Sequence, residues 1–231
     1  MTIRGNIEQP LTRWEDIHEG ARIPRRAVAA AFARAVDAKD PYTSSHSETV
    51  STFCALLAQQ LGFSPGRVAG LRIAGMLHDV GKIGTPDAIL SKPGPLTAQE
   101  FEVVKQHPVK GWEIARAATL EEEAEWILHH HERIDGTGYP HGIAGEEIPV
   151  ESRIILVADA VEAITSNRPY RKGRDTEAAL EEIEANAGTQ FDPEVVTALR
   201  AVLGRAELPE PSKGPASRRP VSLAAASLTT G

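Results

Sequence analysis

The sequence has little cysteine and no long apolar run. Its single cysteine, Cys54, excludes an internal disulfide framework, and the surrounding apolar run TFCALLAQQL favours a small buried side chain over a reactive thiol. No stretch of about 18 apolar residues is present to span a membrane, and the N-terminal MTIRGNIEQP lacks the apolar segment of a signal peptide. We therefore expect a cytoplasmic protein that does not enter the membrane.

An excess of basic residues is also missing. The 25 Lys and Arg are outnumbered by 32 Asp and Glu, which gives a formal net charge of −7 at pH 7. A general nucleic-acid binder would carry a basic footprint, so a nucleic-acid polymer is not expected as a partner. One anionic small molecule in a locally positive pocket is still compatible with this charge.

The alternating apolar and polar pattern of half-buried strands is missing as well. Helical periodicity, caps and breaks instead predict helices over residues 25–39, 44–61, 65–79, 101–106, 109–117, 121–131, 152–165, 176–187 and 193–204. The segment SRIILVADAV would also suit a buried strand, but no second strand candidate accompanies it. We therefore expect an all-α helical bundle.

Composition divides the chain into three parts. Residues 1–22 form a short polar segment, and residues 23–204 hold all the predicted helices in one domain. Residues 205–231 are rich in Pro, Ser, Ala and Gly, which predicts a disordered C-terminal tail.

Histidines and aspartates gather at the ends of the predicted helices. Three consecutive histidines open HHHERIDGTGYPHG at residues 129–142. Taken singly, His46 fits a solvated or core residue, His107 a helix junction, and the pair His78-Asp79 a common dipeptide. Asp159 is the sharpest oddity, because a carboxylate inside IILVADAVEAI is costly to bury unless a cation compensates it.

Together these residues indicate a metal site inside a helical bundle. The set comprises His46, His78, Asp79, His107, Asp159 and two histidines of the 129–131 run, all at the edges of separate predicted helices or inside one. Nitrogen and oxygen donors without thiolates suit iron, manganese or zinc and disfavour calcium or magnesium.

Several motifs resemble those of the HD-GYP domain, a bacterial branch of the HD phosphohydrolase superfamily. DPYTSSHSETV, HDVGKIGTPDAIL, KQHPVKG, HHERIDGTGYPHGIAGEEIP, VADAVEAITSNRPYR and GTQFDPEVV follow one another over about residues 25 to 203. The DGTGYP element with its following GEEIP is highly specific. The resemblance implies a helical domain with a metal-dependent phosphodiesterase activity on cyclic di-GMP or a related cyclic dinucleotide.

The resemblance also implies which residues hold two divalent metal ions. One ion would be held by His46, His78, Asp79 and Asp159, and the other by His107, His130 and His131, with Asp79 bridging the pair. His129 is the extra histidine of the run. Members with three metals carry a glutamate where this chain has Tyr42, so a two-metal centre is expected, with iron or manganese ahead of zinc.

The implied reaction is hydrolysis of cyclic di-GMP to pGpG by a hydroxide that the two metals activate, and the sequence leaves open whether a second cut yields GMP. Asp79 and Lys82 are the implied catalytic residues, and Lys82, Tyr139, Arg168 and Arg171 the implied substrate contacts. Without the resemblance, Lys82 fits a surface lysine, the two arginines a solvated basic turn, and Tyr139 a packing residue. Asp135 is expected to hold its own loop together.

Three rival interpretations stay open at this point. The domain could be a slow cyclic-dinucleotide receptor, an HD-type hydrolase of nucleoside triphosphates or ppGpp, or a structural helical module with incidental histidines. The sequence also leaves open a regulatory protein partner and a homodimer.

Overall fold

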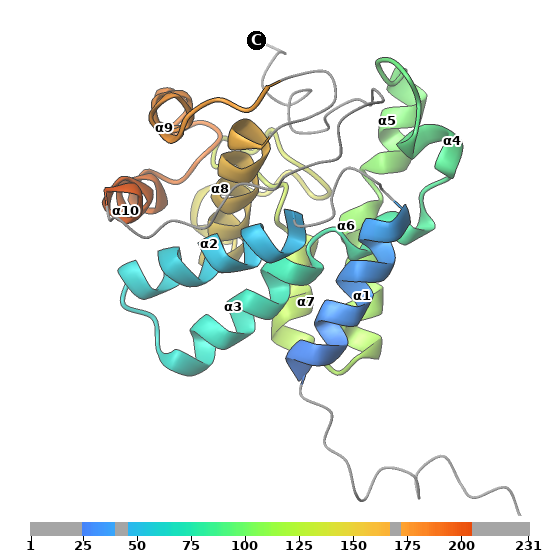
Figure 1. Cartoon of the computed structure of the whole chain (residues 1–231), viewed down its shortest axis with the longest axis horizontal. Helices are drawn as coiled ribbons and strands as arrows, with labels where there is room; N and C mark the ends of the chain where they lie inside the picture. The colour runs from blue at the N-terminus through green and yellow to red at the C-terminus, as the bar shows by residue number, and fades with distance from the viewer. Residues whose placement is uncertain (1–24, 40–45, 167–171, 205–231) are drawn as a thin grey trace, which may run out of the picture.

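The structure is a computed structural model that describes residues 25–39, 46–166 and 172–204 (Figure 1). Its described part contains ten α-helices, two short 3-10 helices and no strand, which confirms the all-α class. The α-helices are α1 (Arg25–Lys39), α2 (His46–Gln60), α3 (Pro65–Leu77), α4 (Asp87–Leu90), α5 (Ala98–Val104), α6 (His107–Ala117), α7 (Glu121–Leu128), α8 (Val150–Thr165), α9 (Thr176–Ala185) and α10 (Pro193–Leu203). The 3-10 helices are η2 (Val80–Gly84) and η3 (Gly145–Glu147).

Helix α8 lies at the centre of the bundle. It contacts α2, α3, α7, α9 and α10, and Figure 1 shows it passing behind α2. Ile154, Ile155, Val157 and Val161 are fully buried. A helix that is apolar on most sides is a core helix, which explains why SRIILVADAV also fitted the pattern of a buried strand.

Several predicted helix ends are confirmed by their caps. The Ser64 hydroxyl accepts a hydrogen bond from the backbone N–H of Arg67 at 3.4 Å, with Pro65 in the first turn of α3. Thr97 and Glu100 form a capping box that starts α5 at Ala98, three residues before the predicted start. Both caps satisfy backbone N–H groups that a helix start otherwise leaves unpaired.

Among the predicted helix ends that differ from the structure, two lie at the histidines and bear on the site. Helix α3 ends at Leu77 instead of continuing to residue 79, and α7 ends at Leu128 instead of including the three histidines. In both places an imidazole replaces the next helical hydrogen bond: His78 Nδ1 donates to the carbonyl of Gly75, and His130 Nδ1 donates to that of Ile127. Side-chain bonding to backbone carbonyls competes with continuation of the helix.

Other predicted features lie outside the described residues. These are the polar segment 1–22, the tail 205–231, Tyr42, Arg168 and Arg171. Among the helices that are described, none is long and apolar enough to cross a membrane.

Candidate metal centre

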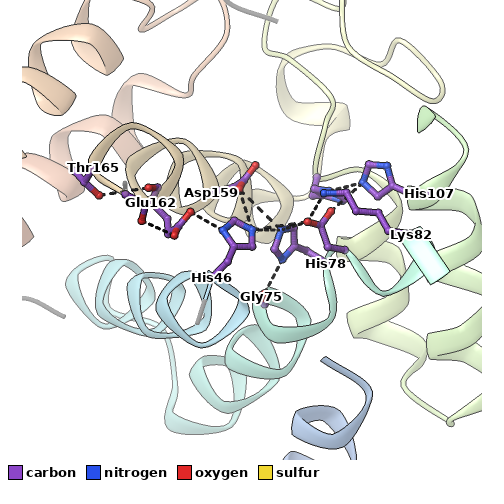
Figure 2. A network of polar contacts seen from close by, with 11 residues as sticks. His46, Gly75, His78, Lys82, His107, Asp159, Glu162 and Thr165 are labelled. Carbon is purple, nitrogen blue, oxygen red and sulfur yellow. Dashed lines mark hydrogen bonds and ion pairs between the residues drawn. The ribbon is translucent and has the colours of Figure 1, made fainter. Parts of the chain in front are cut away.

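The seven side chains predicted as metal ligands lie together in the structure. Four of them, His46, His78, His107 and Asp159, are labelled in Figure 2. His46 begins α2, His78 and Asp79 follow α3, His107 begins α6, His130 and His131 follow α7, and Asp159 lies within α8. Five are buried, whereas His131 and Asp159 are half-buried. Five segments of the chain therefore bring the predicted set to one place.

His46, His78, Asp79 and Asp159 form one half of the cluster, called group A here. Nε2 of His46 lies 3.2 Å from Nε2 of His78. Oδ2 of Asp79 lies 3.7 Å from the His46 Nε2 and 3.4 Å from the His78 Nε2. From α8, Oδ1 of Asp159 approaches the same two nitrogens to 3.4 and 3.9 Å. Group A thus offers two nitrogens and two carboxylates around one point.

Asp79, His107, His130 and His131 form the other half, called group B. Nε2 of His107 lies 3.3 Å from Nε2 of His130 and 3.3 Å from Oδ1 of Asp79. One ligand atom from each of the four residues lies within 4.8 Å of all the others. Asp79 turns Oδ2 toward group A and Oδ1 toward group B, which is the arrangement of a carboxylate that bridges two sites.

The hydrogen bonds of the rings show that these residues fit a metal. The Nδ1 atoms of His78, His107 and His130 donate to backbone carbonyls at 2.8, 2.8 and 2.6 Å. A neutral imidazole that donates through Nδ1 has only a lone pair left at Nε2. In group B the lone pairs of His107 and His130 therefore face one another at 3.3 Å with no proton to share. A cation between them resolves the conflict, and hydrogen bonding of the far nitrogen is the usual support for a metal-binding histidine.

The pKa values of the rings also favour metal binding. Burial lowers the pKa of His107 and of His130 to about 3, and it lowers the pKa of His131 well below the usual 6.5. These rings are therefore neutral at pH 7, as ligands must be. His78 differs: burial acts to lower its pKa, but the neighbouring Asp79 carboxylate raises it to about 9. A bound cation would take the place of that proton.

Lys82 lies beside the shared carboxylate. Its Nζ donates to Oδ2 of Asp79 at 2.5 Å. Although burial acts in the opposite direction, Lys82 and then His78 hold the pKa of Asp79 well below its usual range. Asp79 is therefore an anion with positive groups around it, and Lys82 places an ammonium at the edge of the cluster.

A glycine allows Asp79 to reach group B. A Cβ added to Gly81 would lie 1.9 Å from the carbonyl oxygen of His107 and 2.6 Å from the backbone nitrogen of Gly111. Only a residue without a side chain permits this approach of η2 to α6. The glycine of HDVGK thus places the Asp79 carboxylate against the His107 ring.

The loop that follows α7 presents Tyr139 to the cluster. The Tyr139 ring stacks on that of His131, with centroids 4.7 Å apart and planes inclined by 27°. A Cβ on Gly138 would lie 2.5 Å from the backbone nitrogen of Arg133, so the loop folds closely against the segment that carries the histidines. The Asp135 carboxylate accepts hydrogen bonds from the backbone N–H and the hydroxyl of Thr137 and from the Arg133 guanidinium, so its side-chain bonds lie within the loop.

A cavity of about 390 Å³ borders group B through His131. It is lined by Phe101, Lys105, His131, Arg133, Asp135, Thr137, Gly138, Tyr139, Leu156 and Gln190. The Lys105 ammonium lies 5.0 Å from the ring centroid of Phe101 and 5.9 Å from that of Tyr139. Aromatic faces beside cationic side chains suit a flat, anionic ligand.

Two buried glutamates near the cluster were not singled out from the sequence. Glu162 Oε2 accepts a hydrogen bond from Nδ1 of His46 at 2.5 Å. Glu132 Oε1 accepts from the backbone N–H groups of His141 and Gly142 at 2.6 and 3.1 Å, which ties the loop to the residue next to His131. A second carboxylate in IILVADAVEAI was the available signal for Glu162. His129 donates to the carbonyl of Glu125 and contacts His141, so it lies apart from both groups.

Comparisons with known proteins identify the family and several relatives of the chain. A family model described as the HD domain matches residues 30–195. The chain is 43% identical over 186 residues to the cyclic di-GMP phosphodiesterase response regulator RpfG of Xanthomonas campestris, a match that covers 79% of this chain and 49% of the relative. It is 41% identical over 177 residues to the 3'3'-cGAMP-specific phosphodiesterase 3 of Vibrio cholerae, with 76% of this chain and 38% of the relative covered.

The chain spans about half or less of the length of these curated relatives. Among solved structures, a cyclic GMP-AMP specific phosphodiesterase of V. cholerae superposes with a TM-score of 0.61 at 20% identity, covering 78% of this chain and 48% of that one. That likeness shows the helical fold. Because the family model covers most of the sequence, and the HD-GYP motifs lie within it, the chain belongs to the HD domain family.

Proposed function

We propose that this domain is a metal-dependent phosphodiesterase that hydrolyses cyclic di-GMP to pGpG, and then to GMP. One observation carries the proposal: two pairs of histidine Nε2 atoms, 3.2 and 3.3 Å apart, face one another on either side of Asp79. Paired cation sites that share a carboxylate are the arrangement with which many phosphodiester hydrolases work.

Group A and group B would each hold one divalent cation, with Asp79 shared between them. When bound, such ions make hydroxide available by lowering the pKa of water to about 7, and they stabilise charge on the phosphoryl oxygens. A donor set of imidazoles and carboxylates favours iron or manganese, with zinc as the alternative.

The surroundings of the centre support a cyclic dinucleotide as the substrate. Lys82 at the cluster and Lys105 in the adjacent cavity supply positive charge in an otherwise acidic chain, whereas the Arg133 guanidinium is paired with the Asp135 carboxylate. Tyr139 and Phe101 offer aromatic faces to a base. By the resemblance of NRPYR to the family motif, Arg168 and Arg171 are further proposed contacts, because a guanidinium fork suits phosphate oxygens and guanine edges.

The chain's own residues then have separate parts in the hydrolysis. Asp79 offers one carboxylate oxygen to group A and the other to group B, which fixes the distance between the two sites. The Lys82 ammonium stabilises the negative charge that builds on the phosphate. One water is added across one P–O bond: phosphorus gains the hydroxyl oxygen, and the ribose oxygen leaves with the proton. The first cleavage opens the ring to pGpG, and a second yields GMP.

The test is turnover of cyclic di-GMP by protein that has been stripped with chelator and reconstituted separately with iron, manganese and zinc. We expect metal-dependent release of pGpG, and no release from the stripped protein. Binding of the dinucleotide without turnover under every metal would instead identify a receptor. A parallel panel should contain 3'3'-cGAMP, nucleoside triphosphates and ppGpp, since a preference for either of the last two would point to another HD-type hydrolase.

The cellular location, the bounds of the catalytic domain and the partners are also proposals. We place the reaction in the cytoplasm, where nucleotide second messengers are made, with residues 23–204 as the catalytic domain. Control by a regulatory protein and formation of a homodimer are compatible with a catalytic domain of this size, and size-exclusion chromatography with light scattering tests the second.

A further inference from the structure

The two halves of the centre differ in what supports their histidines. In His78, His107 and His130 the far ring nitrogen donates to a neutral backbone carbonyl. In His46 it donates instead to the carboxylate of Glu162, at 2.5 Å. Glu162 lies on α8 with 0% of its surface exposed, and Figure 2 shows it on the side of His46 away from His78.

The Glu162 carboxylate is held at both oxygens. Oε2 faces the His46 ring, and Oε1 accepts a hydrogen bond from the Ser166 hydroxyl at 2.6 Å, one helical turn later. Glu162 also lies three residues after Asp159, so the two carboxylates share one face of α8. The same face of α8 therefore carries Asp159, a predicted ligand of group A, and Glu162, which accepts the hydrogen bond of His46, another predicted ligand.

This arrangement gives group A more negative charge than group B. Group A contains two carboxylates, Asp79 and Asp159, and Glu162 stands directly behind it, whereas group B contains Asp79 alone. A carboxylate behind an imidazole raises the basicity of the ring and fixes its orientation, and loss of such a partner typically costs about 10- to 100-fold in metal affinity. A carbonyl orients the ring without adding a charge.

We propose that Glu162 is a positioning residue that makes group A the tighter of two unequal metal sites, so that group A fills first. The inference rests on the proposed two-metal centre and adds an order of loading to it. Glu162 acts through His46 and would not contact the metal or the substrate.

A purely structural role is the rival account, because a buried carboxylate between α2 and α8 could simply join the helices. The two accounts differ in which metal site responds to a substitution. Glu162→Gln keeps the shape and an oxygen acceptor for His46 but removes the charge. Glu151→Gln is the matched control: it removes a buried carboxylate from the same helix, about 16 Å away along the axis, where Glu151 pairs with Arg67.

The experiment is Mn²⁺ binding to chelator-stripped protein, followed by calorimetry and by the electron paramagnetic resonance signal of free Mn²⁺. For the unsubstituted chain we expect two dissociation constants that differ by about 10-fold or more. Glu162→Gln should raise the smaller constant by about 10- to 100-fold and leave the larger one in place. Glu151→Gln should change neither, and His107→Ala, which removes a group B ligand, should retain one ion at the smaller constant.

The outcomes separate the inference from the proposed function. Fewer than two ions on the unsubstituted chain would contradict the two-metal centre itself. Two ions with equal constants, no change in Glu162→Gln, or an equal rise of both constants would overturn the role of Glu162 while leaving the centre intact. Should Glu162→Gln lose its helical circular dichroism, Ser166→Ala takes its place: it releases one oxygen of the carboxylate and should weaken the tighter site alone, and an unchanged site would overturn the role.

Discussion

At the scale of single residues, the site depends on one carboxylate that reaches two places. Asp79 comes within 3.4 Å of His78 through one oxygen and within 3.3 Å of His107 through the other. Its neighbours in the chain explain how it does so, because α3 ends at Leu77 and Gly81 allows η2 to approach α6. Few other positions could serve both groups.

Replacement of Asp79 should therefore remove the activity and spare the fold. For Asp79→Ala we expect hydrolysis of cyclic di-GMP to fall by at least about 100- to 1000-fold, because the charge stabilisation of both halves is weakened together. His78→Ala should behave similarly. Turnover, bound metal and circular dichroism are the measurements, with exposed Asp87→Ala as the control. Full turnover in metal-checked Asp79→Ala protein would defeat the assignment.

Arg168 provides a test of substrate binding that is independent of the metals. Arg168→Ala should raise the KM for the dinucleotide and leave the metal content intact, because the resemblance places this guanidinium on the substrate and not in the metal cluster. Metal analysis and initial rates are needed on the same preparation. An unchanged KM would count against the proposed contact.

Histidine titration should give the metal-free protein a stability maximum near pH 6.5. The pKa of His107 and His130 is about 3 in the folded chain and 6.5 when unfolded, so below pH 6.5 the unfolded state binds protons that the folded state does not, and stability is lost toward pH 3. The pKa of His78 is raised to about 9, so its contribution is complete below pH 6.5 and lost as the pH rises toward 9. The urea midpoint in chelator, measured from pH 4 to 9, is the readout. A urea midpoint that does not change between pH 4 and 6.5 would contradict the burial of His107 and His130 as neutral rings.

At the scale of secondary-structure elements, the ends of helices build the site. His78 follows α3, His130 follows α7 and His107 begins α6, and the ring of each donates to the carbonyl three residues before it. Periodicity predicted the helices well, because it reports the apolar face that packs in the core. It misplaced the ends of α3 and α7, because an imidazole that binds its own helix leaves no trace in the apolar pattern.

The buried charges show the same limit of prediction. Asp159 was noticed in the sequence because a carboxylate stood in an apolar helix, and the structure places it at the cluster. Glu162, three residues on, carried the same signal, but its bond to His46 joins residues 116 positions apart. No local pattern reveals such a pairing. The resemblance of the motifs identified the predicted ligands from the sequence. The hydrogen bond from His46 to Glu162 could be found only in the folded structure.

The close packing of the loop after α7 leads to a prediction about a glycine. Gly138→Ala would place a methyl group 2.5 Å from backbone atoms of Glu132 and Arg133, so we expect destabilisation of about 1–3 kcal/mol and weaker metal binding through displaced His131. Gly66→Ala, in helix α3 with nothing within 4 Å, is the matched control and should be neutral or stabilising by up to about 1 kcal/mol. Equal urea midpoints for the two variants would argue against the tight loop.

At the scale of the whole molecule, a small acidic helical domain brings five imidazoles and two carboxylates to one point. Helix α8 passes through the middle of the bundle and contributes Asp159 and Glu162, while α2 and the helix junctions before Asp79, His107 and His130 contribute the rest. The core thus fixes the relative positions of segments that are far apart in the sequence. A rigid centre of this kind is what a two-cation reaction requires, because ligand positions must be held before the substrate arrives.

The most direct test of this account is the location of manganese by anomalous scattering in crystals of the Mn²⁺-loaded protein. The account predicts two peaks, one among His46, His78, Asp79 and Asp159 and the other among Asp79, His107, His130 and His131. A single peak, peaks elsewhere, or no peak from a protein that turns over cyclic di-GMP would contradict the paired centre.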